Sequence, residues 1–239
     1  MAYSANAVSD YISWGNQSAL LTGRATLSFM VRVRFDSLND AFSTGRWIAS
    51  SYGLEASDHR QFRLTSFADG HLTLAFYTEG GGAVSTSTSA SAVTTGVDYC
   101  IVCTYNKTGP TAKIYINGTL ASGSVTGTGD LNIENNSTVD LRVGLGNPSE
   151  YYYAAIGGYA DFAIWQSELT STDATNLSTN AASTISTNLV FNAPMVSDLT
   201  DDVASATGTA TSMGTTTYPE VPSGGGGGST FVPQVIMVL

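Results

Sequence analysis

The chain has 239 residues, of which 12% are charged and 42% hydrophobic, and 9 Lys and Arg residues against 19 Asp and Glu residues give a net charge of −10. This low charge fraction excludes coiled coils and charge-rich helical proteins. The two lysines and seven arginines are too few for the clustered phosphate contacts of a nucleic-acid binder, and no apolar run is long enough to cross a bilayer. We therefore expect neither nucleic acid nor membrane as a partner, and the length suits one large all-β domain.

The negative charge is concentrated toward the end of the chain. Residues 143–239 contain eight acidic residues and no Lys or Arg, whereas residues 1–142 have a net charge of −2. A field that keeps the protein soluble explains this better than affinity for cations or for a basic partner.

Alternation of apolar and polar residues predicts most of the secondary structure. Strands are expected at residues 27–35, 61–65, 71–77, 113–116, 119–121, 141–145 and 158–165. Asp69-Gly70 and Asn117-Gly118 predict type I′ hairpin turns, which need two residues at positive φ. Residues 80–95 and 122–130 are rich in Ser, Thr and Gly and predict loops or short polar edge strands. One short helix is expected at 169–177, capped by Thr170 or Ser171.

The two cysteines are expected to be buried structural thiols. Cys100 and Cys103 lie in a segment that reads as a strand, so their side chains should point to opposite faces and cannot form a disulfide. The chain has no second cysteine pair to complete a zinc site. The first residues lack the basic and apolar regions of a secretory signal, which favours synthesis in a reducing cytoplasm.

The composition changes after residue 219. A run of five glycines, 224–228, forms a flexible spacer, and an uncharged apolar tail follows it. Free in water such a tail is an aggregation hazard, so we expect it to dock on its own domain or on another subunit by adding a strand to a sheet edge. This predicts a domain at 1–219 and a linker with a docking tail at 220–239, with the docking side chains Phe231, Val232, Val235, Ile236 and Val238.

Three segments resemble one known family. Residues 99–120 contain Tyr-Cys-Ile-Val-Cys-Thr-Tyr-Asn followed by a Lys-Ile-Tyr-Ile-Asn-Gly hairpin, and residues 141–170 contain Leu-Arg-Val-Gly followed by Gly-Tyr-Ala-Asp-Phe-Ala-Ile-Trp. Both resemble the laminin-G-like and concanavalin A-like jelly rolls. Residues 189–219 contain Leu-Val-Phe-Asn-Ala-Pro-Met, Asp-Asp, Gly-Thr and Pro, and this ending resembles lectin-like virion proteins of tailed phages.

The resemblance covers about residues 1–219 and implies the fold. It implies an all-β, two-sheet antiparallel jelly-roll sandwich with one short helix and an extended C-terminal tail. The side chains expected in its core are Phe29, Val31, Phe162, Ile164 and Trp165.

The carboxylates do not follow the pattern of the glycanases of this fold, which cleave with two carboxylates on one strand face. The spacing Glu-x-Asp-x-x-Glu is absent, and Asp161 and Glu168 are seven residues apart. His59 and His71 have no evident partners for a catalytic triad. We therefore predict that the protein is not an enzyme.

Glycan binding is one alternative function, because sugar sites need aromatic rings beside polar groups. Tyr151, Tyr152 and Tyr153 form the expected stacking patch, to which Trp47, Tyr52 and Tyr159 are added. Packing of these rings in a loop or an interface is the favoured alternative. Calcium is a possible cofactor, held by Asp198, Asp201 and Asp202 or by the acidic loop residues Asp130, Glu134, Asn135, Asn136 and Asp140.

The other function is structural, and the resemblance together with the tail favours it. It implies a non-enzymatic phage virion protein, such as a capsid decoration protein that its C-terminal tail anchors to capsid or tail subunits. The protein is then expected in the virion and as a homo-oligomer. A tail-fibre protein or surface adhesin that binds a host cell-surface glycan remains the alternative.

Overall fold

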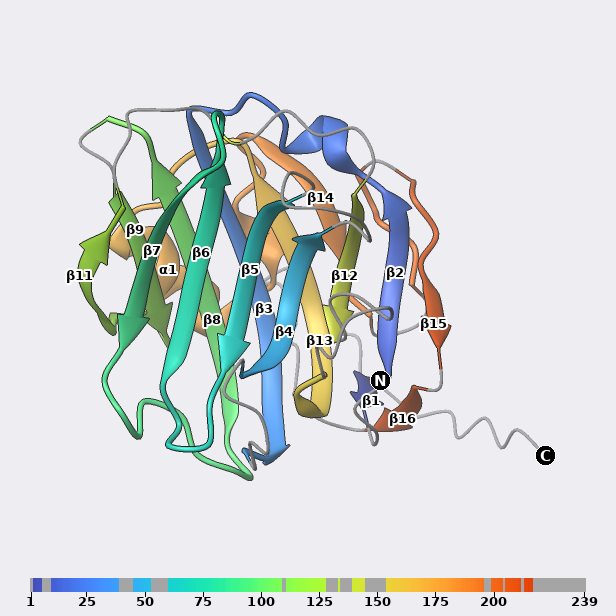
Figure 1. Ribbon diagram of the computed structural model, residues 1–239. Helices are drawn as coiled ribbons and strands as arrows, with labels where there is room; N and C mark the ends of the chain where they lie inside the picture. Colours follow the sequence, from blue (N-terminus) through green and yellow to red (C-terminus); the bar gives the residue numbers. More distant parts are fainter. Residues whose placement is uncertain are drawn as a thin grey trace.

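The structure is a computed structural model, and it describes residues 2–5, 10–38, 45–52, 60–108, 111–127, 133, 139–144, 154–195, 199–203, 205–211 and 213–216. Within these residues the chain forms two eight-stranded antiparallel sheets that stack face to face (Figure 1). This confirms the expected all-β sandwich with one short helix. The predicted C-terminal tail lies outside the described residues. No helix of the described part is long and apolar enough to span a bilayer.

The first sheet, sheet A, is built around β3 and β13, which come from distant parts of the chain. Its strands in spatial order are β10 (Thr119–Leu120), β9 (Thr111–Ile116), β8 (Asp98–Asn106), β3 (Thr26–Ser37), β13 (Ile156–Trp165), β1 (Ala2–Ala5) and β16 (Gly214–Thr216), and β14 (Leu189–Ala193) also pairs with β13.

The second sheet, sheet B, has a run of consecutive strands at its centre. Its strands in spatial order are β11 (Ser122–Thr126), β7 (Gly82–Thr88), β6 (Leu72–Thr78), β5 (Arg60–Ser66), β4 (Arg46–Tyr52), β12 (Asp140–Gly144), β2 (Tyr11–Asn16) and β15 (Thr209–Thr211). The segment 122–130 contributes the edge strand β11, as expected. The segment 80–95 contributes β7, which is not an edge strand, because it pairs with β11 on one side and β6 on the other.

The main hydrophobic core lies between the inner faces of the two sheets. Phe29, Val31, Phe162 and Ile164 are fully buried there, which confirms these core predictions. Trp165 is also fully buried, but it packs in a second cluster on the other side of sheet A. There its indole Nε1–H donates to the carbonyl of Ile185 at 2.7 Å.

The Asn117-Gly118 hairpin is confirmed, and it also seats the helix. Both residues have positive φ, 48° and 81°, as a type I′ turn requires. The side-chain oxygen of Asn117 accepts from the Cys100 amide at 2.8 Å. A Cβ on Gly118 would come within 2.8 Å of the Thr175 Cα, so only glycine permits this approach to the helix.

The Asp69-Gly70 hairpin is confirmed, but its predicted turn type is wrong. Only Gly70 of the two has positive φ, 78°, and its amide donates to the carbonyl of Phe67 at 2.9 Å. The amide of Val93 donates to the carbonyl of Gly70 at 3.0 Å, and a Cβ on Gly70 would meet that Val93 carbonyl at 2.3 Å. The tertiary contact with Val93 therefore favours the longer turn over the two-residue type.

Cys100 and Cys103 are free thiols on opposite faces of β8, as predicted. Cys103 is fully buried between the sheets, and Cys100 is buried on the outer side of sheet A. Burial raises the pKa of the Cys100 thiol to about 12 and raises that of Cys103 well above its ordinary value. Both are therefore protonated and poor nucleophiles at neutral pH.

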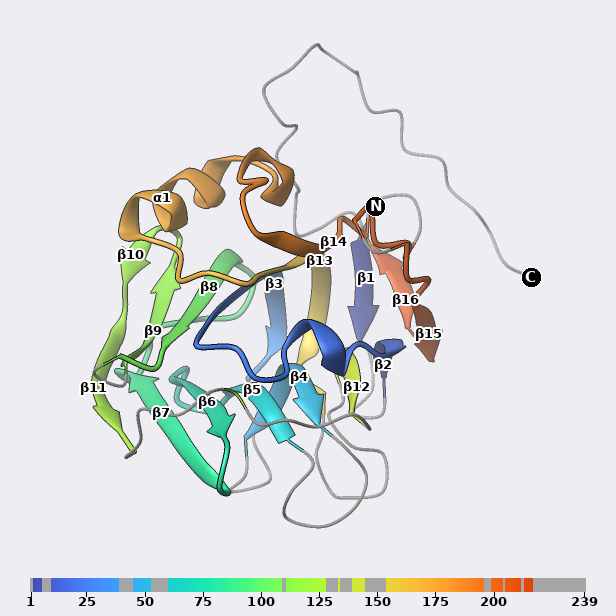
Figure 2. The ribbon, with the colours of Figure 1, turned by 90° about the horizontal axis from the view of Figure 1, so that it is seen from above.

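The helix α1 (Ser171–Thr179) lies on the outer side of sheet A, away from sheet B (Figure 2). Thr170 is its N-cap, and the side chains of Thr170 and Asp173 each accept from the other residue's backbone amide. This capping box confirms the predicted start of the helix. Leu177 and Ala174 face the sheet and are fully buried. Short 3₁₀ helices lie at Ser18–Leu20 and Ala182–Thr184.

The strand β13 pairs with three strands and carries a bulge at Asp161. Along one edge of β13, β1 pairs with residues 157–159 and β14 pairs with residues 162–165. On its other edge, the register with β3 shifts between Ala160 and Phe162. Asp161 is therefore the extra residue of the bulge, and its φ of 50° is unusual for a residue other than glycine.

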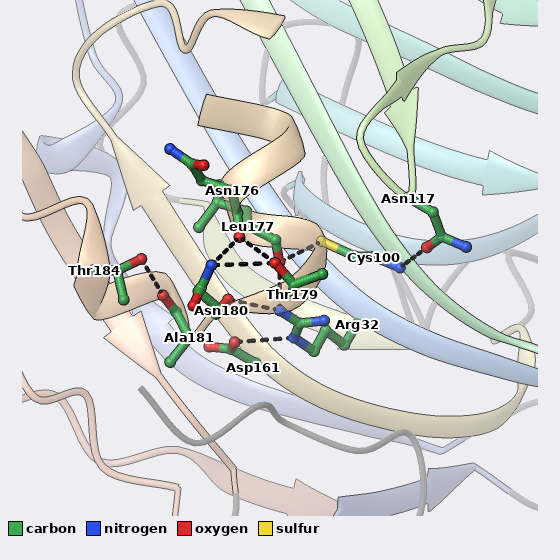
Figure 3. A network of polar contacts seen from close by, with 10 residues as sticks. All are labelled: Arg32, Cys100, Asn117, Asp161, Asn176, Leu177, Thr179, Asn180, Ala181 and Thr184. Atoms are coloured by element: carbon green, nitrogen blue, oxygen red, sulfur yellow. Dashed lines mark hydrogen bonds and ion pairs between the residues drawn. The ribbon is translucent and has the colours of Figure 1, made fainter. Parts of the chain in front are cut away.

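The bulge places the Asp161 carboxylate beside Arg32 beneath the end of the helix (Figure 3). The Arg32 Nε–H donates to the Asp161 carboxylate at 3.2 Å, and Arg32 Nη2 donates to the carbonyls of Leu177 at 2.5 Å and Asn180 at 2.8 Å. The two side chains are only 5% and 2% exposed. This buried ion pair ties the end of α1 to sheet A.

Candidate functional site on the outer face of sheet B

The outer face of sheet B is the face that the described helix leaves uncovered. Alternate residues of β5 and β6, such as Phe62, Leu64, Leu74 and Phe76, point into the core, so the residues between them lie on the outer face. One row of directly paired residues crosses this face from β7 to β2. In spatial order it consists of Ser85, Ala75, Arg63, Ser50, Arg142 and Ser13.

Three aromatic side chains form a cluster on this face, which we call the ring cluster: Trp47, Tyr52 and Tyr77. The Trp47 and Tyr52 rings meet edge to face with centroids 5.0 Å apart, and Tyr52 and Tyr77 do so at 6.2 Å. Trp47 is fully buried, whereas Tyr52 and Tyr77 are each 8% exposed. The three rings are therefore closely packed and more than nine-tenths buried, and only Tyr52 and Tyr77 keep some exposed surface.

Two arginines contact the ring cluster. The guanidinium carbon of Arg60 lies 5.5 Å from the centre of the Tyr52 ring and 5.2 Å from that of Tyr77. The guanidinium carbon of Arg63 lies 6.0 Å from the centre of the Trp47 ring. All three distances are in the range of cation–π attraction. Both arginines are partly exposed.

A third arginine lies further along the same face. Arg142 Nη2 donates to the Asp140 carboxylate at 2.7 Å, and its guanidinium carbon lies 5.2 Å from the centre of the Tyr11 ring. Guanidinium groups, rings and hydroxyls thus lie together on one face of an acidic protein.

Two β-bulges bring these side chains to the same face. Trp47 pairs with Thr65 and Ala49 pairs with Leu64, so Ile48 is an extra residue on β4. Ser51 pairs with Phe62 and Tyr52 pairs with Arg60, so Gln61 is an extra residue on β5. Each bulge shifts the alternation by one residue.

The structure unites only some of the residues predicted for glycan binding. It brings Trp47 and Tyr52 into contact, whereas Tyr151, Tyr152 and Tyr153 lie outside the described residues. Ala154, which follows them, forms a parallel bridge with Trp47. Tyr159 does not belong to the face, because it is fully buried between the sheets. Sequence reasoning missed Tyr77, Arg60 and Arg63. The pattern that could have indicated them is the presence of Arg and Tyr at outward strand positions that are otherwise filled by Ser and Thr.

The carboxylates considered for catalysis are engaged in structural contacts. Asp161 is paired with Arg32, as described above. Glu168 accepts from Lys113 Nζ at 2.6 Å and from Asn106 Nδ2 at 2.7 Å. Burial acts to raise the pKa of Glu168, but these two hydrogen bonds outweigh it and the net pKa is lowered. Of the histidines, His71 stacks on Phe67 with ring centroids 4.1 Å apart, and His59 lies outside the described residues.

The predicted calcium ligands are only partly visible. Asp201 is buried, and its Oδ1 accepts from the amides of Asn192 at 2.6 Å and Val203 at 3.0 Å, which holds the 201–203 turn against β14. Asp202 Oδ2 accepts from Asn192 Nδ2 at 3.4 Å. Asp140 pairs with Arg142. Asp198, Asp130, Glu134, Asn135 and Asn136 lie outside the described residues. In the part that the structure describes, no group of three or more His, Cys, Asp or Glu side chains is placed to hold a metal ion.

Several solved structures share this fold at low sequence identity. A suggested carbohydrate binding protein of Bacteroides ovatus matches with a TM-score of 0.60 and 14% identity, over 89% of this chain and 58% of that protein. The CBM40 of the Ruminococcus gnavus IT-sialidase, bound to α2,3 sialyllactose, matches with a TM-score of 0.56 and 13% identity, over 74% of this chain and 95% of that one. The heptameric SAP-like pentraxin of Limulus polyphemus matches with a TM-score of 0.52 and 14% identity, over 72% and 77%.

These likenesses concern the fold, because the identities are low, and the chain spans little more than half of the Bacteroides ovatus protein. Comparison with curated protein sequences finds no match. A family model described as the concanavalin A-like lectin/glucanases superfamily matches residues 6–175, which is well over half of the chain. The two-sheet sandwich agrees with this match. The chain therefore belongs to the concanavalin A-like lectin/glucanases superfamily.

Proposed function

We propose that the protein binds carbohydrate on the outer face of sheet B and does not cleave it. The observation that carries the proposal is the ring cluster with Arg60 and Arg63 against it. Sugars bind where apolar ring surfaces lie beside fixed polar donors. Here Tyr52 and Tyr77, the members of the ring cluster that keep some exposed surface, offer the apolar contact, and guanidinium groups and strand hydroxyls offer the donors.

Two further observations support binding without catalysis. The described carboxylates nearest to the family's catalytic pattern, Asp161 and Glu168, are engaged with Arg32 and Lys113 instead of standing free. The structural neighbours include a sialidase CBM40 with sialyllactose bound, which is a carbohydrate complex on the same fold.

Replacing Tyr77 with threonine is expected to weaken glycan binding by about two- to tenfold, since a well-placed ring contact contributes about 0.5–1.5 kcal/mol beyond its buried area. Threonine keeps the strand preference of β6. Binding is measured on a glycan array, followed by titration calorimetry with the glycan that binds the wild type.

The matched control is Tyr115→Thr, which removes a similarly buried ring from the outer side of sheet A, under α1. The control should lose stability but keep its affinity for the glycan. Equal affinities of wild type and Tyr77→Thr for the bound glycan would contradict the proposed face, and a wild type that binds no glycan would contradict the function.

We propose in addition that the protein is a virion component, a capsid decoration or tail-fibre protein of a tailed phage, attached through residues 224–239. The glycine spacer and the uncharged apolar tail support this proposal, together with the resemblance of residues 189–219 to lectin-like virion proteins. Calcium and self-association stay predictions as well.

Deleting residues 224–239 is expected to leave a folded lobe that no longer joins the particle, because the apolar side chains of the tail supply the attachment. The measurement is the amount of protein in purified particles, with circular dichroism of the free lobe as the control. Incorporation of the truncated protein at the wild-type level would contradict the anchor.

A further inference from the structure

Arg63 contacts an aromatic ring and forms no ion pair with a carboxylate among the described residues. In the described part of the chain, Arg32, Arg34, Lys113 and Arg142 form ion pairs with carboxylates, and His71 lies beside the Asp69 carboxylate. Arg63 instead lies against the Trp47 ring, and among the described residues its buried Nε–H finds no acceptor. A guanidinium with unused donors at a partly exposed position is a binding group for an anion.

The surroundings of Arg63 favour such an anion. Arg63 lies on a central strand, and the residues directly opposite it on the neighbouring strands, Ser50 and Ala75, are small. The buried Ser50 hydroxyl also has no hydrogen-bond partner among the described residues. On the far side of Ser50 in the same row is Arg142, about 10 Å from Arg63 by the spacing of two strands.

The charge on this face is opposite to that of the protein. Among the described residues, the strands β5 and β12 place three guanidiniums on it, those of Arg60, Arg63 and Arg142, and one carboxylate, that of Asp140. The chain as a whole has a net charge of −10. A positive patch on an acidic protein attracts an anionic ligand locally while the rest of the surface repels it, which orients the ligand toward the patch.

We infer that the glycan bound on this face is acidic, and that Arg63 binds its carboxylate or sulfate group. The inference rests on the proposed function and names the class of its ligand. The planar guanidinium offers two parallel N–H donors to two oxygens of the acid group, and the Trp47 ring restricts the guanidinium before the ligand arrives. The tyrosine edges of the ring cluster then contact the sugar that carries the acid group.

The test uses the whole protein and an array that contains sialylated, uronate-containing, sulfated and neutral glycans. Acidic glycans are expected to bind and their neutral counterparts to bind at least tenfold more weakly. Methyl esterification of a bound uronate or sialate, or desulfation of a bound sulfated glycan, should reduce binding by a similar factor, and these two treatments show which acid group is recognised.

Arg63→Gln should weaken binding of the acidic glycan at least tenfold and remove most of its dependence on salt. The matched control is Arg34→Gln, which makes the same change in net charge on the outer face of sheet A, where Arg34 is partly exposed and pairs with Asp98. The control should bind as the wild type does. Melting temperatures of both variants test that the fold is kept.

The outcomes separate this inference from the function on which it rests. If the protein binds neutral glycans and Arg63→Gln does not change that binding, the inference of an acidic ligand is overturned and the proposed function stands. Binding of an acidic glycan that Arg63→Gln and Arg34→Gln weaken equally would overturn the role of Arg63. An array on which no glycan binds would overturn both.

Discussion

Replacing Arg32 with methionine is expected to lower the free energy of unfolding by about 3–5 kcal/mol at neutral pH, the usual cost of breaking a buried ion pair by removing one partner. Methionine keeps much of the apolar length of the side chain. It leaves the Asp161 carboxylate without its cation, and it leaves the carbonyls of Leu177 and Asn180 without the guanidinium that joins them to sheet A. Chemical denaturation of wild type and variant measures the difference.

Arg34→Met is the matched control, two residues along the same strand and on the same face of sheet A. Its partner is Asp98 at 3.4 Å, but the two side chains are 31% and 39% exposed. An ion pair so exposed contributes about 0–1 kcal/mol, so the control should remain close to the wild type. Losses of similar size in the two variants would contradict a special role for the buried pair.

The thiol of Cys100 offers a second measurement on the same variant. Cys100 Sγ lies 3.4 Å from the carbonyl of Leu177, beneath α1. If Arg32 holds the end of the helix on the sheet, Arg32→Met should open this region more often and expose the thiol. Labelling of Cys100 by a thiol reagent should then be faster in Arg32→Met than in Arg34→Met, and the labelling of Cys103, between the sheets, should change less.

The parts of the fold that the sequence predicts well are those where one face of a strand is buried and the other is polar. The hairpin around Asn117-Gly118 and the capped helix at Thr170 also follow from local chemistry, because positive φ and an orphan amide each select particular residue types. The family resemblance supplied the arrangement of the sheets, which local patterns do not determine.

The strand β4 was missed for a physical reason. All of its residues, Arg46–Tyr52, are buried, so the segment shows no alternation of apolar and polar residues. Its inner side faces the core, and its outer side carries Trp47 and Tyr52, which are buried in the ring cluster. A strand covered on both faces cannot be recognised by a period of two.

The candidate site could not be assembled from the sequence, because its key pairs are separated by odd numbers of residues. Trp47 and Tyr52 are five apart, and Arg60 and Arg63 are three apart, so a regular strand would place the members of each pair on opposite faces. The bulges at Ile48 and Gln61 correct both alternations. The bulge at Asp161 similarly brings its carboxylate to Arg32. Single-residue bulges leave no clear mark in one sequence, yet here they position the polar groups that matter most.

The buried pair also predicts how stability depends on pH. Burial raises the pKa of Asp161 to about 6 from its ordinary value of 3.8, and the attraction of Arg32 only partly offsets this. Between these two values the folded protein holds a proton that the unfolded chain has released. The stabilisation is therefore fully present below about pH 4 and is lost as the pH rises through about 6.

The expected result is that the free energy of unfolding of wild type, relative to Asp161→Asn, falls by about 3 kcal/mol between pH 4 and pH 8, since each pH unit of the interval corresponds to about 1.36 kcal/mol. The comparison with the uncharged amide is needed because other carboxyls, such as Glu168 with its lowered pKa, change stability in the opposite direction as the pH rises. A difference that stays constant or grows with pH would contradict the raised pKa. Repeating the comparison on the Arg32→Met background should move the fall to higher pH, because removing the cation removes the attraction that favours the charged form of Asp161.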